Sequence, residues 1–110
     1  MGFGGANMQK LMKQAQKMQA DMARVQEELK DMTVEGSAGG GMVTVTANGA
    51  QEILAIHVKP EAVDPDDVEM LEDLLLAASK EALRLSKELA AAEMQKVTGG
   101  MNMKMPGGLF

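Results

Sequence analysis

The amino-acid sequence predicts an α+β fold in which a long N-terminal helix, a small three-stranded antiparallel sheet and a long C-terminal helix form a homodimer. Three observations lead to this prediction. Apolar residues recur every three or four positions over residues 8–32 and again over residues 68–92, and the segment between them alternates apolar and polar residues around Asn48-Gly49. Two helical patterns therefore enclose a strand pattern in one chain.

The first helix is expected to begin at Met8, because the three glycines in residues 1–7 predict a flexible N-terminal arm. Its apolar seam continues for more than three heptads without Pro or Gly. The seam can pack on the chain's own sheet or on a second chain, and its methionine and alanine residues do not favour a free-standing coiled coil. Both alternatives stay open. The seam consists of Met8, Leu11, Ala15, Met18, Met22, Val25, Leu29 and Met32.

The segment from residue 39 to residue 58 predicts an antiparallel hairpin. Asn48-Gly49 accepts the positive φ angles that a two-residue type I′ turn requires, and such a turn places Val43 opposite Leu54. One face of the hairpin is then apolar and must be covered by the helices. The other face is expected to carry Thr44, Thr46, Gln51 and His57.

Residues 33–36 predict the third strand, and a glycine-rich loop is expected at residues 37–40. After the sheet, Asp64 and Pro65 predict a helix start, with the aspartate as N-cap and the proline at the first helical position.

The second helix is expected to stop at Gly99-Gly100. Residues 8–98 then form a single dimerising domain, and residues 99–110 form a flexible C-terminal tail. The second helix carries an apolar stripe that is broader than one small sheet needs, which indicates a partner surface.

A homodimer is expected because two apolar helix stripes and a one-sided sheet present more apolar surface than 110 residues can bury alone. The dimer contacts are expected from both helical stripes, at Met18, Met22, Val25, Leu71, Leu75 and Leu85.

The sequence offers little for enzymatic chemistry. It contains no cysteine and a single histidine, His57, and no nucleotide-binding motif follows the glycines at residues 36–41. The carboxylates of residues 64–73 are explained more simply by the favourable electrostatics of a helix N-terminus than by a metal site. We therefore expect no catalytic residue, metal ion, cofactor or small-molecule substrate. No segment suits a membrane span or a signal peptide, so we expect a cytoplasmic protein that does not bind a membrane.

The formal net charge is −5, yet the charges segregate along the chain. Residues 1–26 contain four cations and one acidic residue, Asp21. The spacing of the four cations places them on the helix flank opposite the methionine seam. An acidic block over residues 64–73 separates them from three cations in the second helix. Two such basic stripes could follow a phosphate backbone, although charge alone is explained more simply by solvated helix faces. The seven cations are Lys10, Lys13, Lys17, Arg24, Lys80, Arg84 and Lys87.

Five segments resemble, in their order, the YbaB/EbfC family of bacterial nucleoid-associated proteins, and together they cover essentially the entire chain. The resemblance implies a tight homodimer that binds double-stranded DNA in the nucleoid with low sequence specificity, through its protruding helical parts. Effects on DNA conformation, gene expression and nucleoid organisation are a further expectation from the family. The DNA contacts would then be the seven cations named above. The segments are FGGANMQKLMKQAQKMQADMARVQEEL, GSAGGGMVTVTANG, VKPEAV, MLEDLLLAA and MQKVTGGM.

One feature departs from the family pattern. Leu54 and His57 stand in the hairpin where relatives often have polar or basic residues, so we leave the sheet out of the expected DNA surface. The alternative function is a dimeric protein-interaction module associated with DNA recombination or repair. The salt dependence of binding to unrelated duplexes discriminates between the two functions, because phosphate contacts make the affinity fall steeply with salt.

Overall fold

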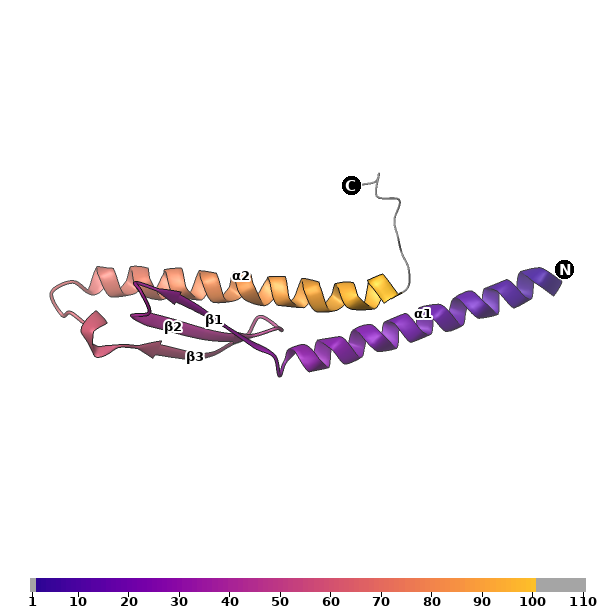
Figure 1. Cartoon of the computed structure of the whole chain (residues 1–110), viewed down its shortest axis with the longest axis horizontal. Coiled ribbons are helices and arrows are strands. Elements are labelled where there is room, and N and C mark those ends of the chain that lie inside the picture. The colour runs from indigo at the N-terminus through magenta and orange to yellow at the C-terminus, as the bar shows by residue number, and fades with distance from the viewer. Residues whose placement is uncertain (1, 101–110) are drawn as a thin grey trace, which may run out of the picture.

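The computed structural model describes residues 2–100 of the chain, and the side chains of residues 7–99. A long helix leads into a three-stranded antiparallel sheet of order β1-β2-β3, and a second long helix lies along one face of that sheet (Figure 1). The expected α+β fold with two long helices and three strands is therefore confirmed. The elements are α1 (Gly2–Leu29), β1 (Thr33–Ala38), β2 (Val43–Asn48), β3 (Ile53–Val58), the short 3-10 helix η1 (Pro60–Ala62) and α2 (Val68–Gly100).

The ends of the two helices differ in part from the sequence-based expectation. Helix α1 begins at Gly2, so residues 2–7, which we expected to form a flexible arm, are helical. Helix α2 includes Gly99 and Gly100, the last described residue, so the stop expected at Gly99-Gly100 and the flexible tail expected from residue 99 do not begin there. Residues 101–110, for which we expected a flexible tail, lie outside the described residues.

The start of α2 corrects the expected N-cap. Asp64 forms a separate turn before the helix, in which its Oδ1 accepts a hydrogen bond of 2.9 Å from the backbone N–H of Asp66. The cap is Asp67, whose Oδ1 accepts a hydrogen bond of 3.2 Å from the backbone N–H of Met70. An aspartate at the N-cap satisfies one of the free N–H groups of the first turn.

The register of the hairpin also differs from the prediction, because the β2–β3 connection is not a two-residue turn. Val43 lies opposite Val58 and not opposite Leu54, and Val45 lies opposite Ile56. Neither Asn48 nor Gly49 has a positive φ, whereas Gln51 has a φ of 65°. Residues 49–52 form a longer loop, and the register shifts again at Thr46/Ala47. Thr44 lies opposite His57, whereas the expected register placed it opposite Ile53.

Strand β1 is longer than expected and includes Ser37 and Ala38. The loop to β2 then begins at Gly39, and the three consecutive glycines have φ angles of 65°, 66° and 93°. Such angles strain any residue with a side chain, which explains why glycines occupy this turn.

The hydrophobic core lies between the sheet and α2. Val43, Val45, Ala78 and Ala82 are completely buried there, together with Ala47. At Gly36 of β1 the two backbones approach so closely that a Cβ atom would lie 2.2 Å from the backbone nitrogen of Ala82. Small residues on both elements therefore allow α2 to lie directly on the strand.

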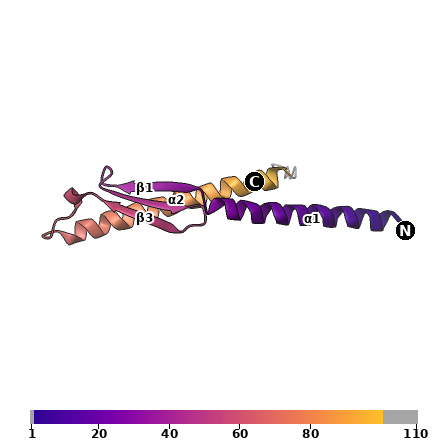
Figure 2. The same ribbon diagram turned by 90° about the horizontal axis from the view of Figure 1, so that it is seen from below.

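Helix α1 projects away from this core (Figures 1 and 2). Its last turns contribute Val25 and Leu29, each 4% exposed, whereas all side chains from residue 7 to residue 17 are exposed. The molecule measures 79 × 30 × 16 Å, and its radius of gyration is 21.1 Å. A compact chain of this length would have a radius of gyration of about 13 Å. Most of α1 is therefore an arm that has no packing partner among the described residues of its own chain.

Candidate nucleic-acid interface

A row of three lysines follows the projecting half of α1. Lys10, Lys13 and Lys17 are exposed, and at 100° per residue they fall within an arc of about 60° on the helix surface. The first twenty residues contain these three lysines and no Asp or Glu. Among the side chains that the structure describes, no carboxylate pairs with any of the three. This row, which we call the α1 lysine row, is therefore uncompensated positive charge.

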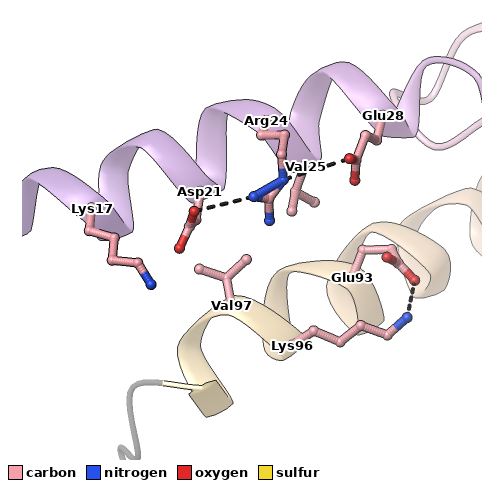
Figure 3. A pocket seen from close by; sticks show the side chains of 8 residues that line it. All are labelled: Lys17, Asp21, Arg24, Val25, Glu28, Glu93, Lys96 and Val97. Carbon is pink, nitrogen blue, oxygen red and sulfur yellow. Dashed lines mark hydrogen bonds and ion pairs between the residues drawn. The ribbon is translucent and has the colours of Figure 1, made fainter.

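Arg24 lies on the same arc of α1 but has a different environment. Its guanidinium pairs with Asp21 at 3.2 Å and with Glu28 at 3.6 Å, so its charge is already balanced within the helix. It also lines a groove of about 340 Å³ between α1 and the C-terminal part of α2, opposite Lys96 and Val97 (Figure 3).

The groove itself contains equal numbers of acidic and basic side chains. Lys96 of α2 pairs with Glu93 at 2.8 Å, in addition to the ion pairs of Arg24. A phosphate group entering this groove would meet carboxylates on both walls, so the groove is not a favourable anion site. The groove is lined by Lys17, Asp21, Arg24, Val25, Glu28, Glu93, Lys96 and Val97.

The three cations of α2 divide in the same way. Arg84 pairs with Glu81 and, at 2.5 Å, with Glu88. The hydrogen bond from Arg84 lowers the pKa of Glu81, and the same contact raises the pKa of Arg84. Lys80 and Lys87 are exposed and have no ion pair within the described residues. Arg84, in contrast, must break its ion pairs with Glu81 and Glu88 before it can bind a phosphate.

The acidic block lies at the far end of the molecule. The carboxylates of residues 64–73 precede and begin α2, whose first turn lies at the opposite end of the structure from the N-terminus of α1 (Figure 1). Within the described residues they do not gather into a group that could hold a metal ion. The long axis of the molecule thus separates the negative block from the α1 lysine row.

The residues expected at a dimer interface occupy three kinds of environment. Val25 is almost completely buried in its own chain, and Leu71 and Leu75 pack partly against the sheet core. Met18, Met22 and Leu85 are half-buried.

The apolar face of the hairpin, on which the sequence placed Leu54 and Ile56, was expected to be covered by the helices, and this expectation is wrong at β3. Helix α2 covers β1 and β2, while Ile53, Leu54 and Ile56 remain 44%, 53% and 52% exposed. Ile56 lies opposite Val45 and so shares the sheet face on which α2 packs. We call these three residues the β3 apolar face. The run ILAI marks this surface in the sequence, but the sequence does not show that α2 leaves it exposed.

Exposed lysines on a projecting helix, without carboxylate partners among the described side chains, are a feature suited to binding a polyanion through charge. Over residues 3–101 the sequence matches the YbaB/EbfC DNA-binding family, and the chain belongs to this family. This membership confirms the resemblance inferred from the sequence and agrees with the expectation that the chain is not an enzyme. No helix in the described part of the chain is both long and apolar enough to cross a membrane.

Two relatives illustrate the similarity. A protein of Acetivibrio thermocellus, named a nucleoid-associated protein, is 65% identical over 100 residues, which are 91% of this chain and 88% of the relative. A nucleoid-associated protein of Pelotomaculum thermopropionicum is 57% identical over 103 residues, which are 94% and 96% of the two chains. The crystal structure of an uncharacterized protein from Helicobacter pylori has a TM-score of 0.60 at 23% identity, and the match covers 71% of this chain and 90% of that one. It supports the fold alone.

Proposed function

We propose that this protein is a nucleoid-associated protein that binds double-stranded DNA as a homodimer with low sequence specificity, and that the α1 lysine row supplies its main phosphate contacts. The observation that carries the proposal is the exposure of Lys10, Lys13 and Lys17 without compensating carboxylates among the described side chains. Relatives that are more than half identical to this chain bear the name nucleoid-associated protein.

The chemistry of the row favours contacts to the phosphate backbone over contacts to bases. Lysine is a point charge on a flexible stem, and duplex DNA carries one negative charge per about 1.7 Å of its axis. Lys10 and Lys17 are about 10 Å apart along the helix, so the row can meet several phosphates of one strand. The chain contains no Trp or Tyr for stacking on bases. Specificity should therefore be low and depend on DNA shape.

The remaining cations support this surface to different degrees. Lys80 and Lys87 add positive charge on α2, whereas Arg24 and Arg84 are held by carboxylates. The acidic block at the other end should be repelled by the duplex and so orient the protein with α1 toward it.

A second copy of the chain is supported by the amount of surface that one chain exposes. The accessible surface is 7817 Å². A compact monomer of this mass would expose about 5,900 Å². The excess is more than twice the roughly 800 Å² that each partner contributes to a standard interface. We propose that the β3 apolar face and the neighbouring leucines of α2 form this interface, with Met18 and Met22 of α1 as a further contact.

Replacing Lys10, Lys13 and Lys17 together with glutamine should weaken binding to every duplex by a similar factor, at least about tenfold at low salt. In a plot of log affinity against log salt concentration, the slope should decrease by roughly one unit for each phosphate that the variant no longer binds. Fluorescence anisotropy with several unrelated duplexes over a salt series measures both quantities.

The matched control replaces Lys30, Lys59 and Lys96 with glutamine, which removes the same charge from other parts of the chain. Lys30 and Lys96 already pair with Glu27 and Glu93, so we expect a much smaller change. Substituting Thr44 and Thr46 on the sheet with glutamine should leave the affinity unchanged. If both controls weaken binding as strongly as the row variant, the α1 lysine row is not the contact surface.

The alternative function, a dimeric module that holds a protein of DNA recombination or repair, predicts a flat salt response on duplex DNA. A dimer that presents two α1 arms would instead contact DNA at two places. We propose that these two contacts alter DNA conformation and so influence nucleoid organisation and gene expression. A nucleoid location in the cell follows from the same proposal.

A further inference from the structure

The side chain of Asn48 connects three parts of the fold at one buried point. It is 1% exposed, and its Nδ2 donates hydrogen bonds to the backbone oxygen of Lys30 at 3.2 Å and to Oε1 of Glu52 at 2.7 Å. Its Oδ1 accepts hydrogen bonds of 3.0 Å from the backbone N–H groups of Ala50 and Glu52. All the hydrogen-bonding capacity of this amide is therefore used.

The backbone around Asn48 extends the same network to both helices. The hydroxyl of Ser86, a completely buried residue of α2, donates a hydrogen bond of 2.6 Å to the backbone oxygen of Asn48. The N–H of Gly49 donates to the backbone oxygens of Leu29 and Met32, at 2.8 and 2.9 Å. A Cβ atom at position 49 would lie 2.5 Å from Cδ2 of Leu29, so the end of α1 rests directly on this loop. We call residues 48 and 49 with these partners the Asn48 joint.

The rest of α1 offers little that could hold its direction. Val25 and Leu29 are its only buried side chains among those described, and both lie in its last two turns. Apolar contacts are not directional and allow one element to rock on another, whereas hydrogen bonds require defined angles. Met18 and Met22 are half-buried as well, but the hydrogen bonds that hold the end of α1 in a defined direction are those of the Asn48 joint.

The geometry of α1 enlarges any movement at the joint. Lys10 is 19 residues before Leu29, which corresponds to about 28 Å of helix. A rotation of about 10° at Leu29 would displace Lys10 by about 5 Å, more than the roughly 3.4 Å of axis between successive phosphates of one strand.

We propose that Asn48 is a positioning residue for DNA binding: it fixes the direction of α1 relative to α2 and so places the α1 lysine row on the phosphate backbone. This inference rests on the proposed function, because the row must be the contact surface for its placement to matter. Asn48 itself is buried and touches no DNA.

The test measures the distance between the two helices and the DNA affinity in the same variants. The chain contains no cysteine, so Gln14→Cys on α1 and Gln95→Cys on α2, both at exposed positions, allow selective spin labelling. Labelled chains are diluted with unlabelled chains, and double electron–electron resonance reports the distance within one chain. The labelled chain with Asn48 and Ser86 unchanged should give one narrow distribution of distances between the two labels. Asn48→Ala should broaden it, and should lower the affinity for every duplex by on the order of tenfold with a smaller salt slope, because fewer lysines engage at once.

Val45→Ala is the matched control. It creates a cavity in the completely buried core between β2 and α2, whose members do not include α1, and lowers stability without altering the Asn48 joint. At a temperature at which circular dichroism shows all variants folded, Val45→Ala should keep the narrow distribution and the affinity. If Asn48→Ala does not fold, Ser86→Ala removes a single hydrogen bond of the joint and should broaden the distribution to a smaller extent.

A distribution that stays narrow in both joint variants would overturn the inference, as would equal broadening by Val45→Ala. The two proposals can fail separately. If the joint variants broaden the distribution and the Lys10, Lys13 and Lys17 variant still binds DNA normally, the joint controls α1 but the α1 lysine row is not the contact surface. If affinity falls without broadening, Asn48 does not act by positioning α1.

Discussion

Gly36→Ala is expected to destabilise the fold by more than about 3 kcal/mol, a large part of the 5–15 kcal/mol that stabilises a typical domain. The added Cβ would lie 2.2 Å from the backbone nitrogen of Ala82 and 2.7 Å from the backbone oxygen of Ala78. Backbone atoms cannot rotate away as a side chain can, so β1 and α2 would have to separate. Urea unfolding followed by circular dichroism measures the free energy of unfolding.

Gly99→Ala is the appropriate control, because a Cβ there has no neighbour within 4 Å in α2. Alanine is also favoured over glycine in a helix, by about 1 kcal/mol, so stability should stay equal or rise. A Cβ at position 40 also has no neighbour within 4 Å, but Gly40 has a φ of 66°. Gly40→Ala should therefore moderately destabilise the fold through backbone strain. Equal stability of Gly36→Ala and Gly99→Ala would mean that β1 and α2 are not in backbone contact.

The elements of the fold could be predicted from the sequence because each one is specified by local periodicity. The register could not, and Asn48 shows why. The Asn-Gly pair is a strong signal for a two-residue turn when the asparagine is free to take a positive φ. Here the buried side chain of Asn48 closes a longer loop and also donates a hydrogen bond to the backbone oxygen of Lys30, the residue after α1 and 18 positions earlier in the chain. A contact at that separation leaves no trace in local sequence patterns.

The candidate DNA surface could likewise be predicted only in part, because local spacing identifies its residues but not the direction of the helix that carries them. Spacing alone places Lys10, Lys13 and Lys17 on one arc, and the absence of carboxylates before Asp21 makes them an uncompensated row. The ion pairs of Arg84 could also have been anticipated, because Glu81 and Glu88 stand three and four residues away on the same helix. What spacing could not give is the direction of α1, since that depends on the Asn48 joint.

Ile56→Asp is expected to dissociate the proposed homodimer. Ile56 is 52% exposed in the single chain and lies in the β3 apolar face, beside the core but outside it. A carboxylate there would remain hydrated in the monomer and lose its water in the dimer. A two-fold interface contains the substituted residue of both chains, so the loss of dimerisation free energy should exceed about 4 kcal/mol. Such a loss raises the dissociation constant by roughly a thousandfold. Leu75 is a poorer choice, because it packs on the core of its own chain.

Sedimentation equilibrium at micromolar concentration measures the dissociation, and His57→Asp provides the control on the adjacent residue. His57 lies opposite Thr44 on the other face of the sheet and is exposed, so its replacement adds the same charge to the same strand without entering the proposed interface. We expect His57→Asp to remain dimeric and Ile56→Asp to sediment as a monomer. If Ile56→Asp stays dimeric while Met18→Asp or Met22→Asp dissociates, the two chains associate through α1, and the β3 apolar face has another role.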